Sequence, residues 1–80
     1  MKRNRMVLII WVDSNIVHGW ISPGEASSHH VAEAQSVGFF VKEDDKEIVI
    51  AMGESETGLL IECKAIPKGC IKSVKELRIK

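Results

Sequence analysis

The chain has 80 residues, 45% of them hydrophobic and 28% charged, which is the composition of a small folded domain rather than of a disordered segment. Its formal net charge is zero at pH 7, so the charge of the whole molecule gives no argument for binding to nucleic acid or to a membrane surface. We expect a single domain over residues 1–80, with modest stability unless it forms oligomers.

The first apolar run predicts a strand that is covered on both faces. Residues 6–12 are consecutive apolar positions, rich in β-branched types, and the run ends at Asp13. Alternation places Trp11 on one face with Val7 and Ile9, and we assign it to the core. The run is too short to span a bilayer, and no small-residue cleavage site follows it. We therefore expect no signal peptide, no membrane association, and a cytoplasmic location with reduced cysteines.

Residues 14–35 follow an irregular pattern with glycine, proline and small polar residues throughout, and we expect them to form one long loop. Within it, Ser22, Pro23 and Glu25 have the spacing of a capping box, which predicts a short helix beginning at Pro23. Loops longer than about 12 residues in compact domains are often functional. The loop is therefore the first place to look for a binding site, and its Trp20 is a candidate anchor.

A β-hairpin is predicted over residues 36–52, because two stretches with alternating apolar residues flank the polar run at 43–46. The aspartates of that run favour a turn, since their carboxylates can accept hydrogen bonds from nearby backbone N–H groups. Gly38 lies inside the first strand, where glycine indicates a bulge or the close approach of another backbone, and we expect a strongly bent strand. We assign Phe39 to the core, so that Phe40 faces the other way and becomes a second candidate anchor.

The last third of the chain predicts two more strands joined by a tight turn. Residues 59–65 alternate in hydrophobicity with Cys63 on the apolar face, so Cys63 is interpreted as a buried thiol. The proline and glycine of residues 66–69 indicate a tight turn with the length of one turn of 3₁₀ helix. The spacing of residues 70–79 fits a strand with a bulge or a helix, and we favour the strand.

Together these elements predict an all-β domain, a small and partly open five-stranded barrel with one long loop after the first strand. The order resembles Src-homology-3-like and Sm-like barrels, in which the last strand returns beside the first. A second resemblance rests on Trp11-x-Asp13-Ser14, Gly19-Trp20, Ser36-Val37-Gly38-Phe39, Glu43-Asp44-Asp45 and Ile66-Pro67-Lys68. This pattern is similar to small uncharacterised proteins encoded by bacteriophages and prophages. The resemblance implies a bacterial or phage-infected host and brings no activity with it.

We expect neither a catalytic nor a metal centre. The histidines at 29–30, with Cys63 and Cys70, are side chains of the types that bind zinc, but the cysteines are too far apart in the sequence for a paired ligand. No local arrangement suggests a cysteine nucleophile with an oriented histidine, and there is no glycine-rich phosphate loop. The sequence favours a non-enzymatic protein without metal or cofactor. We expect it to dock on a protein partner through the long loop, with Trp20 and Phe40 as apolar anchors.

Basic residues near the two ends of the chain suggest two further hypotheses. In the predicted barrel the last strand lies beside the first, which would gather the bases Arg3, Arg5, Lys72, Lys75 and Arg78. Such a face could hold an anionic partner, and nucleic acid is the less favoured alternative to a protein. A structural homo-oligomer, either a dimer or a small ring, is the other alternative, because an open barrel leaves strand edges that a second copy could cover.

Overall fold

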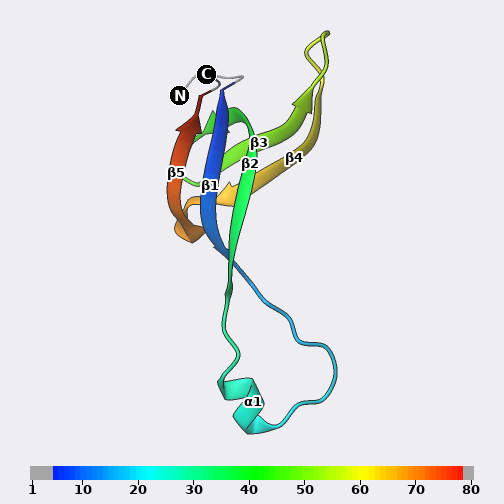
Figure 1. Ribbon diagram of the computed structural model, residues 1–80, viewed down its shortest axis with the longest axis vertical. Helices are drawn as coiled ribbons and strands as arrows, with labels where there is room; N and C mark the ends of the chain where they lie inside the picture. Colours follow the sequence, from blue (N-terminus) through cyan, green and yellow to red (C-terminus); the bar gives the residue numbers. More distant parts are fainter. Residues whose placement is uncertain (1–4, 79–80) are drawn as a thin grey trace.

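The computed structural model describes residues 5–78 of the chain (Figure 1). These residues form strands, one short α-helix and a single turn of 3₁₀ helix, η1. In chain order the elements are β1 Met6–Asp13, α1 Pro23–Ser27, β2 Ala32–Glu43, β3 Glu47–Glu54, β4 Leu60–Pro67, η1 Lys68–Cys70 and β5 Ile71–Leu77.

The five strands make one antiparallel sheet in the order β4-β3-β2-β1-β5. The last strand lies beside the first, whereas β4 and β5, both fully described, are not paired with each other. The sheet is strongly curved but does not close, with β3 and β4 crossing behind β1 and β2 (Figure 1). The predicted mainly β fold, with five strands in a partly open arrangement, is confirmed. The final segment is a strand and the turn before it is a 3₁₀ helix, as predicted.

The concave face of the sheet forms the core. Val7 and Ile9 of β1 are fully buried and pack with Ile50 of β3 and Ile66 of β4, and Trp11 lies partly buried against this cluster. The inward placement of Trp11 with its two neighbours is thus confirmed. The other face of β1 is only half covered, so the prediction that both faces are buried holds for one face; the half-buried residues are Met6, Leu8, Ile10 and Val12.

Gly38 of β2 lies at a close approach of the neighbouring strand β3. A Cβ atom at this position would lie 2.8 Å from the carbonyl oxygen of Ala51 and 3.2 Å from Cβ of Ile50. Just beyond it, the pairing of β2 with β3 shifts register between Phe40 and Lys42, which marks a bulge or irregularity. The predicted close backbone approach in a bent strand is confirmed.

The two phenylalanines of β2 face opposite to the sequence prediction. Gly38 pairs with Val7 and shares its inward face, so Phe40, two residues further on, also points inward and is 6% exposed. Phe39 pairs with Met6 and lies half-buried on the outer face. The assignment of Phe39 to the core and of Phe40 to the opposite face is therefore wrong, because the inward face of β2 is the one that contains the glycine.

β4 also presents the face opposite to the expected one. Ile66 is 1% exposed and pairs with Ile48, and the two-residue period then places Lys64 and Glu62 on the inward side. Cys63 is exposed, so its interpretation as a buried thiol is wrong. Because Ile66 must point into the core, the even-numbered residues of β4 face inward and the odd-numbered ones face outward. This arrangement leaves two large apolar side chains exposed, Leu59 and Ile61.

Residues 14–31, here called the arm, extend away from the sheet and carry α1 at their far end (Figure 1). The ladder between β1 and β2 runs as far as the pair Asp13 and Ala32, so the loop is shorter than the predicted 14–35. The molecule measures 52 × 28 × 22 Å, with a radius of gyration of 16.1 Å. A compact domain of this length would have a radius of gyration of about 12 Å. The projecting arm explains the difference.

Candidate functional site

The arm carries a group of large apolar side chains that lie outside the core. Trp20 is completely exposed, with a relative exposure of 104%. Single exposed apolar residues are common on protein surfaces, so it is their concentration in this one segment that makes the arm a candidate interaction site. Four further residues of the arm belong to this exposed group, Ile16, Val17, Ile21 and Val31.

Local hydrogen bonds give the arm a defined shape. The Ser22 hydroxyl accepts a hydrogen bond from the backbone N–H of Glu25 at 3.1 Å, and the Glu25 carboxylate accepts from the Ser22 backbone N–H at 3.4 Å. The capping box and the helix that begins at Pro23 are therefore confirmed. Nε2 of His29 lies 2.7 Å from the carbonyl oxygen of Asn15, which joins the outgoing and returning halves of the arm. The apolar side chains are thus displayed on a segment with local order.

The two predicted anchors are not brought together. Trp20 is exposed on the arm, where the sequence placed it, but Phe40 packs in the core with 6% of its surface exposed. A core position removes Phe40 from any surface site, so the prediction that it is an exposed anchor is wrong. Whether Trp20 contacts a partner stays a prediction.

The predicted basic face is divided and partly neutralised. Arg5 forms an ion pair with Glu76 at 3.2 Å, and Lys72 forms one with Glu33 at 2.6 Å. Glu76, the ion-pair partner of Arg5, lies opposite the inward-facing Val7 of β1, whereas its neighbour Lys75 lies opposite the outward-facing Leu8. The bases therefore do not share one face. Two further predicted bases complete the set: Arg78 is exposed, and Arg3 lies outside the described residues.

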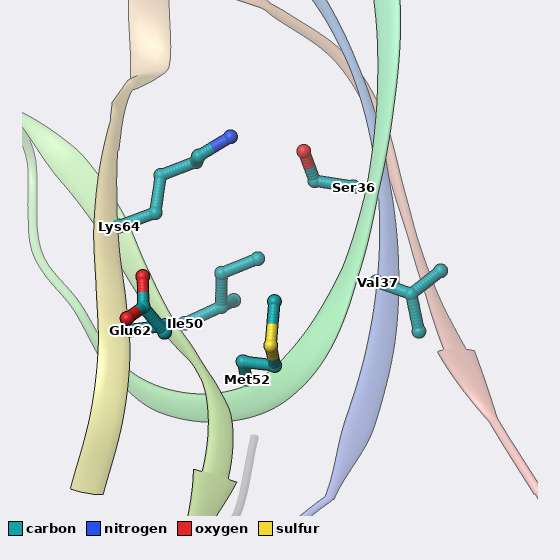
Figure 2. Close-up of a pocket in the computed structure, with 6 residues that line it drawn as sticks. All are labelled: Ser36, Val37, Ile50, Met52, Glu62 and Lys64. Carbon is teal, nitrogen blue, oxygen red and sulfur yellow. The ribbon is translucent and has the colours of Figure 1, made fainter.

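A groove that was not expected from the sequence lies on the concave face of the sheet. Its volume is about 190 Å³, and its lining residues are Ser36, Val37, Ile50, Met52, Glu62 and Lys64. Figure 2 shows the Lys64 and Ser36 side chains pointing toward one another across one end, with Glu62 and Met52 toward the other. The alternation of charged and apolar residues in β4 was the sequence signal for this groove. The sequence interpretation placed the apolar residues of β4 on the inward face, whereas the charged residues Glu62 and Lys64 lie there.

Trp11 fixes the polar end of this groove. Its indole Nε1–H donates a hydrogen bond to the Ser36 hydroxyl at 3.0 Å, and the Lys64 ammonium lies 5.2 Å from the centroid of its ring. This is the geometry of a cation–π contact. Glu62, also in the lining, has a φ of 54°, which is unusual for a residue other than glycine and costs on the order of 1–3 kcal/mol. The groove therefore combines the Lys64 ammonium, positioned over an aromatic ring, with a locally strained backbone at Glu62.

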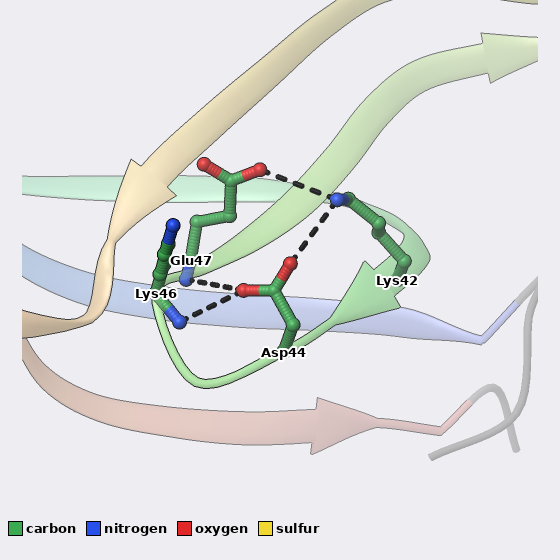
Figure 3. A network of polar contacts seen from close by, with 4 residues as sticks. All are labelled: Lys42, Asp44, Lys46 and Glu47. Carbon is green, nitrogen blue, oxygen red and sulfur yellow. Dashed lines mark hydrogen bonds and ion pairs between the residues drawn. The ribbon is translucent and has the colours of Figure 1, made fainter.

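The acidic turn between β2 and β3 is built as a structural turn (Figure 3). One Asp44 carboxylate oxygen accepts hydrogen bonds from the backbone N–H groups of Lys46 at 2.8 Å and Glu47 at 2.9 Å. The Lys42 ammonium lies 3.2 Å from the other Asp44 oxygen. Together these contacts lower the pKa of the Asp44 carboxyl, the backbone hydrogen bonds most of all. The predicted bonding of an aspartate to turn N–H groups is confirmed for this residue.

Neither a metal centre nor a membrane span is found in the part of the chain that the structure describes. Among residues 5–78, no group of three or more His, Cys, Asp or Glu side chains could hold a metal ion. Both cysteines, Cys63 and Cys70, are free thiols. None of the described helices has the length and apolar character needed to cross a bilayer.

No family model, curated protein or solved structure matches this chain.

Proposed function

We propose that this protein is a non-enzymatic binding module that docks on a protein partner through its arm, with Trp20 as the main anchor. The observation that carries the proposal is the complete exposure of this tryptophan on a segment that projects from the sheet. Exposing a large aromatic side chain to water is unfavourable, and tryptophan is among the residues that contribute most to binding energy in interfaces.

The other exposed residues of the arm support a protein surface as the partner. Ile16, Val17 and Ile21 are apolar and close to the tryptophan in the chain, and they would surround it with apolar contacts. The arm between residues 14 and 31 contains no lysine or arginine, so it offers no fixed positive charge to a phosphate backbone. The resemblance to bacteriophage and prophage proteins favours a partner in a bacterial cytoplasm.

The test is site-specific cross-linking followed by measured affinity. A photoreactive amino acid at Ile21, next to the anchor, would be activated in a bacterial lysate, and a captured protein would be purified and titrated. We expect Trp20→Ala to weaken its binding roughly thirty-fold or more, the effect of removing a residue that dominates an interface.

The matched control is Leu59→Ala, since Leu59 is 72% exposed but lies outside the arm. This variant should bind as tightly as the wild type. Equal binding by wild type and Trp20→Ala would contradict the proposed role of the arm.

A further inference from the structure

We propose that two copies of this chain form a symmetric dimer in which the Trp20 indole of each copy occupies the groove of the other. This inference rests on the proposed function, because it takes the arm as the binding element and names a second copy of the chain as the protein that it binds. The two contacts are related by a two-fold axis, so each interaction occurs twice and the assembly is closed.

The groove has the size of one large side chain. Its volume of about 190 Å³ is smaller than that of a typical small-molecule pocket, which is roughly 300–1,000 Å³. Ile50 and Met52 supply its apolar surface, and Met52 is 71% exposed, so much of that surface is uncovered in a single copy (Figure 2). An aromatic ring inserted here would remove its own apolar surface and that of Met52 from water together.

The charged residues of the groove suit an indole ring in particular. Lys64 makes no ion pair with another described residue, and its ammonium already lies over the ring of Trp11. A cation within about 6 Å of a ring centroid is attracted to the ring face, and tryptophan is the strongest such partner. Glu62 likewise makes no ion pair with a described residue, and its carboxylate can accept the hydrogen bond that a buried indole N–H requires.

The arrangement of the chain favours insertion between copies rather than within one. The ladder of β1 and β2 ends at Asp13 and Ala32, and the arm continues beyond that end, away from the sheet (Figure 1). The groove lies on the sheet itself, at Ser36 of β2. Two copies packed with their arms in opposite directions would place each arm along the other sheet, and this packing would also cover the remaining apolar residues of the arm.

The experiment compares variants by analytical ultracentrifugation over a range of concentrations, with tryptophan fluorescence as a second readout. Wild type should sediment as a dimer, and the Trp20 emission, obtained by difference from Trp20→Phe, should shift to shorter wavelength on dimerisation. Trp20→Ala and Met52→Arg should each raise the dimer dissociation constant roughly a thousand-fold or more, because a homodimer of either variant loses both symmetric contacts, each worth roughly thirty-fold. The control Leu59→Arg replaces a residue of equal exposure, 72% against 71%, outside the groove and should leave the dimer intact.

Mixing the two disabled variants gives the decisive measurement. Trp20→Ala retains its groove and Met52→Arg retains its tryptophan, so a mixed dimer has one intact contact where each variant alone has none. We expect the mixture to dimerise more tightly than either variant alone. A mixture no tighter than its components would overturn the reciprocal contact.

Two other results would also overturn the inference, and they separate it from the proposed function. A wild-type monomer with water-exposed Trp20 emission leaves the arm free for a different protein, so only the dimer is refuted. A wild-type monomer with Trp20 emission already shifted to shorter wavelength would mean that the arm folds onto its own groove. That result refutes both the dimer and the docking arm.

Discussion

Replacing Gly38 with alanine should destabilise the fold, because the added methyl group meets a backbone carbonyl oxygen that cannot rotate away. The new Cβ would lie 2.8 Å from the carbonyl oxygen of Ala51 and 3.2 Å from two carbon atoms of Ile50. A side-chain end could move aside, but a carbonyl oxygen in the pairing of β2 with β3 moves only with its strand. Relieving the clash therefore requires a change in the curvature of the sheet, and a change of one side-chain rotamer is not enough.

Two opposing effects set the magnitude for Gly38→Ala. Forcing an extra methyl group into a packed site costs about 1–3 kcal/mol, while alanine restricts the unfolded chain and returns about 0.4–1 kcal/mol. The expected net loss in the free energy of unfolding is about 0–2.6 kcal/mol, with a midpoint of about 1.3 kcal/mol. Since each kcal/mol shifts the melting temperature of a domain this small by about 4–8 °C, the change is measurable.

Urea and thermal unfolding followed by circular dichroism will measure the effect of Gly38→Ala. The matched control is Gly69→Ala, because a Cβ at Gly69 meets no atom within 4 Å and the residue has no positive φ. The control should be neutral or slightly stabilising. If Gly38→Ala is as stable as the control, the close approach of the strands is not a constraint on the fold, and the explanation of the bend is refuted.

Three further predictions test other contacts. Phe40→Ala should cost about 3–5 kcal/mol in urea unfolding and clearly more than Phe39→Ala; the reverse order would contradict the assigned faces of β2. Ser36→Ala should cost about 0.5–1.5 kcal/mol by removing the acceptor of the indole N–H of Trp11, and an unchanged urea midpoint would refute that bond. Because the folded-state pKa of Asp44 lies below its ordinary value of 3.8, its contribution is present above that pH and is lost as the pH falls through the lower folded value. Asp44→Asn should therefore lose less stability than wild type between neutral and strongly acidic pH in thermal melts, and an equal loss would contradict this role.

The order of elements could be predicted because each one has a local signal. Ser22 and Glu25 have capping-box spacing, the turn at residues 43–46 contains a bonding aspartate, and Pro67 precedes the 3₁₀ turn. These signals depend on residues close in the sequence, so they are present before any tertiary contact forms. The helix start, the hairpin and the tight turn before the final strand were predicted on that basis.

The inward faces could not be predicted, because alternation shows which residues share a face but not which face is buried. In β2 the inward face includes Gly38, whereas the more apolar set of alternating residues, which contains Phe39, lies on the outer face. In β4 the contact of Ile66 with the core decides the phase, and it brings Lys64 inward against Trp11. Both choices depend on strand pairs that form across the sheet. The groove and the burial of Phe40 follow from them, so both were missed.

The direct pairing of Asp13 with Ala32 means that the sheet does not need the arm to hold β1 and β2 in register. The entropy of closing a loop grows slowly with its length, and halving the loop changes it by only about 0.6 kcal/mol. The residues between these two positions can therefore be shortened, lengthened or replaced with little effect on the rest of the fold. Natural variation or engineering could change what this chain binds while the five strands remain the same.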